Sequence, residues 1–355
     1  MPVADTDPLS GLPLADYRPY SRLRLPQSTV PRASAPAVDG HTHLGRWLTG
    51  ERWAVPDVAA FVDLMDSCNI TAAVNLDGRW GNELEDNLDR FDRSHPHRFA
   101  TFCHVDWDVL HDPGAEAKLA GSLERSVSAG ARGLKVWKDL GLGVQDADGK
   151  LVLPDDPRLD ALWETAGRLG VPIAIHTADP VAFFDPVDAS NERLDELLAR
   201  PDWSFCDPRF PGFNRLMEAL EAIVAAHPAT TFIGVHAGCY AEDLAWVSRM
   251  LERYPNFNID IAARIAELGR QPRAARALIM NHPGRVLFGT DEIPPNRPTY
   301  EIYFRFMETA DECFPYSPDN PPGSGRWPIS ALDLPGDVLG QVYAGNAERL
   351  IPGLA

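Results

Sequence analysis

Short apolar runs and longer amphipathic stretches alternate along most of the chain. From residue 35 onward, each apolar run ends in polar residues and is followed by a stretch in which apolar residues recur at helical spacing. The apolar runs predict eight strands, at residues 36–41, 71–76, 98–103, 131–137, 171–176, 231–236, 256–261 and 285–290. The amphipathic stretches predict helices near residues 56–68, 84–94, 114–129, 157–169, 214–226, 241–253, 272–281, 298–313 and 337–350.

This alternation predicts an α/β protein built as a (β/α)8 TIM barrel. Strands joined by helical crossovers are parallel, and eight of them close into a barrel whose inward side chains form a packed core. The main alternative is an open doubly wound sheet, which would carry a glycine-rich phosphate loop after its first strand. Neither GxGxxG nor GxxxxGK[ST] occurs in the sequence, so we expect one barrel domain over residues 35–355.

Three segments fall outside the repeat. Residues 1–34 are rich in Pro, Ser and Arg, and we expect them to form an arm on the domain surface that could reach a partner subunit. Residues 177–213 and 315–335 are long irregular connections, and such loops usually serve as lids or interfaces. Because 177–213 follows a strand with candidate site residues, we expect it to form a pocket wall, whereas 315–335 is equally compatible with a dimer contact.

Composition narrows the classes of partner. The chain has 33 basic and 51 acidic residues, a net charge of −18, and such a surface repels nucleic acid and anionic lipid. Five scattered cysteines without a CxxC pair favour a reducing compartment. The N-terminal sequence lacks the features of a signal peptide, and no apolar run approaches 18 residues. We therefore expect a soluble cytoplasmic protein that acts on a small molecule.

The first predicted strand carries the clearest candidate for metal chemistry. It reads Val-Asp-Gly-His-Thr-His over residues 38–43, and alternate side chains of a strand share a face. His41 and His43 would then point the same way, and two imidazoles can bind one divalent ion at about 2.0–2.1 Å each. Taken alone the pair is a weak signal, because two surface histidines in a loop are the ordinary alternative.

Polar residues at the ends of the other strands strengthen the signal. In a parallel barrel the C-terminal strand ends meet on one face, where active sites lie. A single histidine there is more often structural, and an aspartate is usually a helix N-cap, but such residues follow strands one, five, six and eight. The strand-end residues are Asp77, Arg79, Trp80, His104, Asp106, Lys135, Trp137, Lys138, His176, Asp179, His236, Asp260, Arg264, Asp291 and Glu292.

These motifs resemble the amidohydrolase superfamily, and in particular the branch that contains aminocarboxymuconate-semialdehyde decarboxylase, the resorcylate decarboxylases and many "amidohydrolase 2" proteins. The resemblance extends over roughly 36–351 and rests on VDGHTHLG, IAIHTADP, FIGVHAG, VLFGTDEIP and VYAGNAERLI. It implies one divalent ion, zinc first and manganese as the alternative, held by His41, His43, His176 and Asp291. It also implies that His236 lies beside the metal-bound water.

The chemistry of this ligand set predicts an enzyme. A divalent ion with an open position can lower the pKa of bound water towards ~7 and polarise a carbonyl, while His236 and Asp291 move protons. We expect a hydrolase acting on a C–N or C–O bond of an amide, cyclic imide or lactone. The alternative is non-oxidative decarboxylation of an aromatic or enoic acid at the same metal site. A non-catalytic metal-binding protein is the third interpretation.

The remaining strand-end residues suggest a small organic acid as substrate. Arg79 and Arg264 could recognise a carboxylate, although surface ion pairs with Asp77 or Glu267 are the ordinary alternative. Lys135 or Lys138 could be carboxylated to bridge two ions, but a charged lysine that binds an anionic substrate group or pairs with Asp260 fits this branch better. Enzymes of the branch suggest a homodimer. The predicted substrate-binding residues are Arg79, Trp80, His104, Lys135, Trp137 and Arg264.

Overall fold

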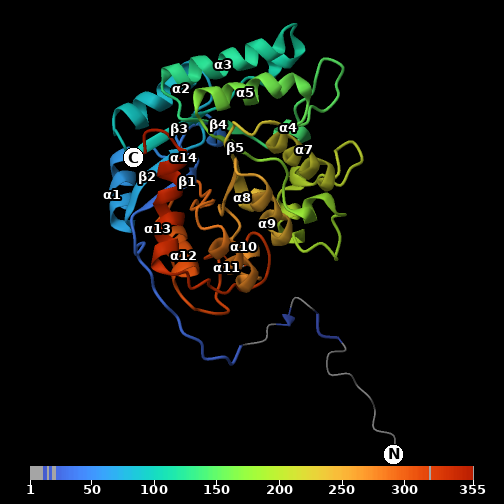
Figure 1. Cartoon of the computed structure of the whole chain (residues 1–355). Coiled ribbons are helices and arrows are strands. Elements are labelled where there is room, and N and C mark those ends of the chain that lie inside the picture. Colours follow the sequence, from blue (N-terminus) through green and yellow to red (C-terminus); the bar gives the residue numbers. More distant parts are fainter. Residues whose placement is uncertain (1–10, 14–15, 18–20, 320, 355) are drawn as a thin grey trace, which may run out of the picture.

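The computed structural model describes residues 11–13, 16–17, 21–319 and 321–354. Within them, eight parallel strands form one sheet in the order β1 to β8, with helices packed around it (Figure 1). The strands are β1 (Ala37–Thr42), β2 (Ile70–Asn75), β3 (Phe99–Cys103), β4 (Gly133–Val136), β5 (Ile173–Ile175), β6 (Phe232–Gly234), β7 (Phe257–Asp260) and β8 (Val286–Leu287).

The sheet curls until its last strand meets its first. The backbone N–H of Gly40 donates to the carbonyl of Phe288 at 3.0 Å, and the N–H of Asp291 donates to the carbonyl of His41 at 2.9 Å. The predicted TIM barrel is therefore confirmed, and the open doubly wound sheet is wrong. β8 is much shorter than the predicted 285–290, because the chain bends after Leu287 and reaches Asp291 in the left-handed region, at φ 61°.

Helices follow the strands in sequence and cover the outside of the barrel (Figure 1). Several begin at side-chain caps: the Asp57 carboxylate accepts from the Ala60 N–H at the start of α1, and the Asn296 side chain accepts from Thr299 at the start of α12. The outer helices are α1 (Val58–Cys68), α2 (Gly81–Leu88), α3 (Ala115–Ala129), α5 (Asp160–Leu169), α7 (Phe213–Ala226), α9 (Leu244–Arg253), α11 (Pro272–Asn281), α12 (Arg297–Glu308), α13 (Gly336–Gly340) and α14 (Asn346–Leu350).

The helix predictions differ from the structure mainly at their ends. The predicted helix 84–94 is α2 followed by a π-helical turn at Asp89–Arg93, and a second π-helical turn at Gln341–Gly345 joins α13 to α14. Short helices that were not predicted lie in the loops after strands, where no helical period can develop. They are α4 (Asp139–Leu142), α6 (Leu194–Ala199), α8 (Val235–Gly238) and α10 (Ile265–Leu268).

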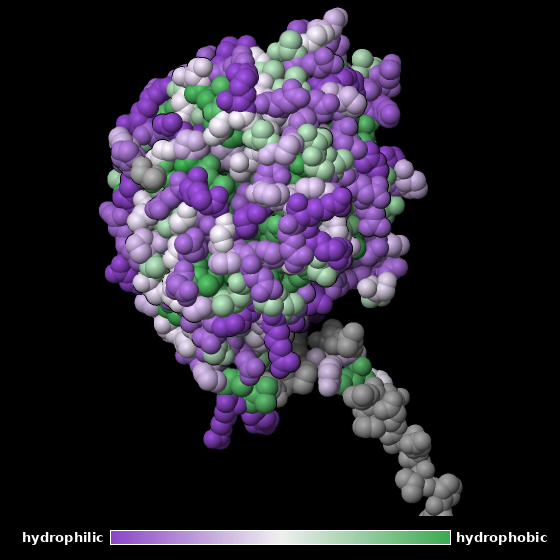
Figure 2. Space-filling model, in the orientation of Figure 1, coloured by the Kyte–Doolittle hydropathy of each residue, from purple (hydrophilic) through white to green (hydrophobic). Residues whose placement is uncertain are grey.

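The strands and the inner faces of the helices form one continuous apolar core. The face shown in Figure 2 is mostly hydrophilic, with scattered small apolar areas. Among the described residues, no helix combines the length and the hydropathy that a membrane span requires.

The described part of the arm is attached to the barrel near the end of α12. The backbone and hydroxyl of Ser28 donate to the carboxylate of Asp311, at 2.7 and 2.9 Å, and the Ser34 N–H donates to Glu308 at 2.9 Å. These bonds place residues 28–34 on the outside of the barrel. Contact between the arm and a partner subunit stays a prediction.

Candidate active site

β1 places two buried histidines inside the C-terminal end of the barrel. The Nδ1 atom of His41 is 2.7 Å from Oδ2 of Asp260, and Nδ1 of His43 is 2.7 Å from Oδ1 of Asp77. Because a carboxylate only accepts, each Nδ1 carries a proton, and Nε2 presents a lone pair when the ring is neutral. Burial lowers the pKa of His41, whereas at His43 the carboxylates of Asp77 and Asp291 outweigh burial and raise the pKa to about 9, so a metal ion would displace a proton from Nε2 of His43. Carboxylates in this position orient ligating imidazoles and increase their basicity.

Asp291 brings its carboxylate to the two Nε2 atoms. Its Oδ1 lies 3.4 Å from Nε2 of His41 and 3.1 Å from Nε2 of His43. Burial would raise the pKa of this carboxyl, but electrostatic attraction to the neighbouring imidazoles, that of His41 first, outweighs burial and holds its pKa well below the ordinary value. Its backbone is left-handed at φ 61°, a strained conformation that the hydrogen bond to His41 stabilises.

His236 lies on the other side of Asp291. Its Nδ1 donates to the carbonyl of Ala262 at 2.8 Å, which leaves its Nε2 as a lone pair 3.8 Å from Oδ2 of Asp291. The backbone at His236 is left-handed, at φ 59°, and its N–H donates to Asp260 at 2.7 Å. Burial is the main cause that lowers the pKa of His236 well below 6.5, so the ring is neutral.

His176 follows β5 and stacks edge-on against His236, with ring centroids 4.5 Å apart. Its Nε2 is 3.2 Å from Oδ1 of Asp179, whose other oxygen pairs with Lys138 at 2.5 Å. Mainly burial lowers the pKa of His176 to about 4. The structure therefore brings His176 beside the other histidines but turns its Nε2 towards Asp179, and its role as a metal ligand stays a prediction.

These donors fit one divalent metal ion. Ligand atoms of His41, His43 and Asp291 lie within 4.8 Å of one another, and the buried Nε2 atoms of both histidines have no hydrogen-bond partner among the described residues. Neutral imidazoles with a carboxylate are the ligands of catalytic zinc sites. A second group, formed by His41, His236 and Asp260, is not a separate site, because both oxygens of Asp260 already accept hydrogen bonds.

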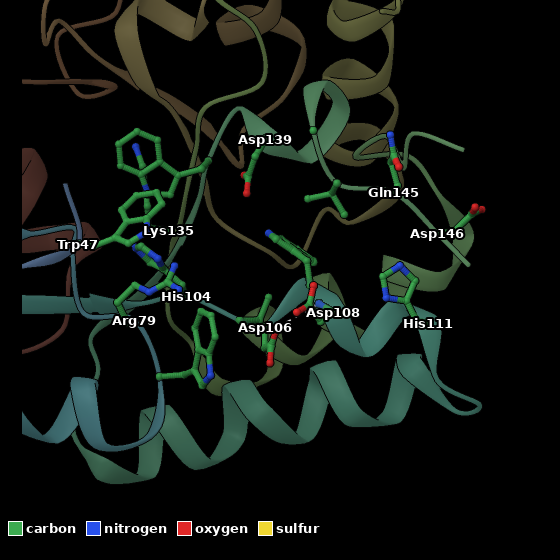
Figure 3. A pocket seen from close by; sticks show the side chains of 16 residues that line it. Trp47, Arg79, His104, Asp106, Asp108, His111, Lys135, Asp139, Gln145 and Asp146 are labelled. Carbon is green, nitrogen blue, oxygen red and sulfur yellow. Dashed lines mark hydrogen bonds between the residues drawn. The ribbon is translucent and has the colours of Figure 1, made fainter. Parts of the chain in front are cut away.

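A cavity of about 640 Å³ adjoins this group on the side of β2 to β4. Trp137 lies between the cavity and the group of histidines. Its ring is 5.1 Å from that of His43 and 4.5 Å from that of Trp47, which lines the cavity. Arg79, His104, Lys135 and Trp47 gather at one end of the cavity (Figure 3). The complete lining is Trp47, Arg79, Trp80, His104, Val105, Asp106, Trp107, Asp108, His111, Lys135, Trp137, Asp139, Gly143, Val144, Gln145 and Asp146.

Arg79 and His104 contribute different properties to the inner end of the cavity. The Arg79 guanidinium lies over the ring of Trp80 at 4.1 Å and over that of Trp47 at 5.0 Å, contacts that hold a cation in place. Nε2 of His104 donates to the carbonyl of Leu76 at 2.6 Å, and mainly burial lowers the pKa of His104 to about 3. His104 is therefore an uncharged wall beside a fixed cation.

Lys135 and Lys138 point to different sides of β4. Lys135 is buried, and its Nζ lies 5.1 Å from the ring of Trp137 with no hydrogen-bond partner among the described residues. Burial lowers its pKa. Lys138 instead lies over Trp203 at 4.7 Å and pairs with Asp179. Of the two lysines, only Lys135 lines the cavity.

Arg264 lies away from this cavity. It is buried after β7, where its Nη1 donates to the carbonyl of Ala263 at 2.7 Å. Burial would lower its pKa, but the nearby carboxylates of Glu267 and Glu242 outweigh burial and raise it. Its predicted contact with substrate stays a prediction. The aromatic residues of the 177–213 connection also pack elsewhere: Phe183 stacks on Trp203, with centroids 6.0 Å apart.

Sequence reasoning left three important residues without a role. Asp77 and Asp260 were recognised at strand ends, but their hydrogen bonds to the two histidines were not foreseen. Trp47 lies in the loop after β1, and its position on the C-terminal side of the barrel was the only available signal. It closes the inner end of the cavity against Arg79 and Trp137.

Residues 38–353 match the sequence profile of the Amidohydrolase family, Amidohydro_2. The chain belongs to this family. The resemblance seen in the sequence is therefore confirmed at the level of the family, whose members bind a divalent metal ion. A search of curated proteins finds no match to this chain.

Solved structures of this amidohydrolase-family fold cover nearly the whole chain at low identity. A 2,6-dihydroxybenzoate decarboxylase from Rhizobium matches with TM-score 0.54 and 18% identity, over 89% of this chain and 98% of that one. An amidohydrolase from Burkholderia multivorans with bound zinc has TM-score 0.52 and 15% identity, over 89% and 99%. A putative amidohydrolase from Staphylococcus aureus has TM-score 0.54 and 15% identity, over 89% and 99%. At these identities the likeness shows the fold alone.

Proposed function

We propose that this amidohydrolase-family protein is a metal-dependent hydrolase that cleaves a C–N or C–O bond of an amide, cyclic imide or lactone. The observation that carries the proposal is the neutral His236, whose Nε2 lone pair faces the carboxylate of Asp291 at 3.8 Å. A neutral imidazole next to a metal-binding group is a suitable general base for activating water.

His41, His43 and Asp291 would hold the ion, with His176 as the predicted fourth ligand and zinc or manganese as the metal. When bound, the ion supplies a Lewis acid that polarises a carbonyl and makes water a nucleophile near pH 7. His236 accepts a proton at Nε2 and is kept in that tautomer by its Nδ1 bond to Ala262. Asp291, within reach of His236, passes the proton to the leaving nitrogen or oxygen.

Decarboxylation of an aromatic or enoic acid is the second candidate. Four tryptophans and two cationic side chains line the cavity, a combination that suits a planar acid. A solved relative of the fold is named 2,6-dihydroxybenzoate decarboxylase. In this reaction the C–C bond to the carboxylate breaks and carbon dioxide leaves with the carboxylate oxygens. Water supplies the proton that His236 or Asp291 passes to the ring or alkene carbon, which keeps the electron pair of the broken bond.

Product analysis distinguishes the two reactions. The metal-loaded protein would be screened against lactones, cyclic imides, amides and aromatic acids in water enriched in oxygen-18. Incorporation of the label into product indicates hydrolysis, and release of carbon dioxide without incorporation indicates decarboxylation. His236→Asn should abolish turnover while keeping the metal, and His282→Asn, at the end of α11 and outside the candidate site, is the matched control. Full activity of the His236 variant would refute the proposed base.

A further inference from the structure

Three buried nitrogen atoms at the inner end of the cavity have no acceptor among the described residues. They are Nε of Arg79, Nζ of Lys135 and Nε1 of Trp137, and all three residues line the cavity. Each atom is a hydrogen-bond donor, and a buried donor without an acceptor costs about 1–3 kcal/mol. This end of the cavity is therefore complementary to a ligand that presents acceptor oxygens.

The two cations among these donors occupy separate positions. Lys135 comes from β4 and lies over Trp137, whose ring also adjoins that of His43. Arg79 comes from the loop after β2 and lies between Trp47 and Trp80. The neutral His104 of the intervening strand lies at the same end of the cavity (Figure 3). One small anionic group does not account for two cations that come from different parts of the barrel and lie over different aromatic residues.

Existing carboxylates do not neutralise either cation fully. The carboxylate paired with Arg79 is that of Glu83, at 3.8 Å from Nε and partly exposed, and Lys135 has no ion pair within 4.0 Å among the described residues. A charge-assisted bond to a ligand oxygen is roughly twice as strong as a neutral one. A ligand with two negative charges would therefore gain from both positions.

We propose that the substrate carries two anionic oxygen groups, one bound by Lys135 beside the metal-binding group and the other bound by Arg79 between Trp47 and Trp80. This inference rests on the proposed function for the site and names its substrate class. The substrate is also compact, because carboxylates line the middle and outer parts of the same cavity (Figure 3) and repel an anion placed there. These carboxylates belong to Asp106, Asp108, Asp139 and Asp146.

Equilibrium binding tests this inference without requiring turnover. The full-length, metal-loaded protein would be titrated with benzamide, benzoate and the 1,2-, 1,3- and 1,4-benzenedicarboxylates, with tryptophan fluorescence as the signal. We expect the best dicarboxylate to bind at least about tenfold more tightly than benzoate, and benzoate more tightly than benzamide. Similar dissociation constants for all five probes, or no binding at millimolar concentration, would overturn the proposal.

Variants assign each charge to its residue. Arg79→Met should reduce the dicarboxylate advantage to less than about threefold and leave benzoate binding nearly unchanged, whereas Lys135→Met should weaken both acids about tenfold. Arg46→Met is the matched control, because Arg46 also lies over a tryptophan, Trp53 at 4.7 Å, but outside the cavity. Equal losses for benzoate and dicarboxylates in the Arg79 variant would also overturn the proposal.

Two checks keep the result interpretable. Lys135→Met leaves no paired carboxylate behind, because Nζ of Lys135 has no partner among the described residues, so we expect the variant to fold. Lys135→Gln provides a second variant if the first does not fold. Selective dicarboxylate binding in a protein that turns over no substrate would contradict the proposed reaction and support the binding inference. Metal-dependent turnover of a neutral or singly charged substrate, with equal binding of all probes, would support the proposed reaction and contradict the binding inference.

Discussion

Asp77→Asn should weaken binding of the divalent ion about 10- to 100-fold while the barrel stays folded. The carboxylate of Asp77 accepts from Nδ1 of His43 at 2.7 Å, and both side chains are buried. Asparagine has a similar shape and keeps an acceptor oxygen, but it removes the negative charge. That charge strengthens the hydrogen bond and makes Nε2 of His43 more basic. A hydrogen bond to a charged group contributes about 1.5–3 kcal/mol, and a loss in this range corresponds to about 10- to 150-fold in affinity.

The assay is competition between the protein and a chelator of known zinc affinity at pH 7.5. Circular dichroism and urea unfolding of the metal-free variant would separate a change in affinity from a change in folding. Asp86→Asn is the matched control, since Asp86 pairs with Arg46 at 2.6 Å on the surface. A zinc dissociation constant within twofold of the wild-type value would refute the assignment of Asp77 as the residue that orients His43.

Three further predictions test the site and the fold. His41→Ala combined with His43→Ala should remove the bound metal, measured by mass spectrometry of the purified protein; undiminished metal content would place the ion elsewhere. Gly78→Ala should destabilise the barrel by about 1–3 kcal/mol in urea, because the added Cβ would lie 2.3 Å from a β3 carbonyl oxygen. Arg193→Met should lower the free energy of unfolding by about 3–5 kcal/mol, because it leaves the buried Glu267 without its partner. Adding Glu267→Gln should recover part of this loss. Equal free energies of unfolding for the single and the double variant would argue against this pairing.

The sequence predicted the barrel because each strand can be recognised from its own short run of residues. A buried parallel strand is a short apolar run, and runs such as Ile173–Ile175 and Phe232–Gly234 are separated by stretches of clear helical period. Strand ends were harder to place. β6 stops at Gly234 because the chain turns into left-handed backbone at His236, and no side-chain period signals such a turn.

Pairings inside the site depend on side-chain direction across distant strands. The sequence placed His41 and Asp260 on the correct face, but their hydrogen bond joins residues 219 positions apart. Strand-end position likewise could not separate Lys135, which lines the cavity, from Arg264, which turns towards a neighbouring acidic group. Convergence at one face was predictable from topology, whereas the individual contacts required the three-dimensional structure.

The position of Lys135 also bears on how many ions the site holds. A carboxylated lysine bridges two ions, and the second ion would need ligands of its own. The remaining candidate group depends on Asp260, whose oxygens already accept from His41 and from the backbone of His236. The geometry therefore favours one ion per chain and a Lys135 that is not carboxylated. Lys135→Met should retain about one metal ion per chain, as expected for a mononuclear site. Two ions in the wild type that fall to one or none in this variant would instead establish a lysine bridge.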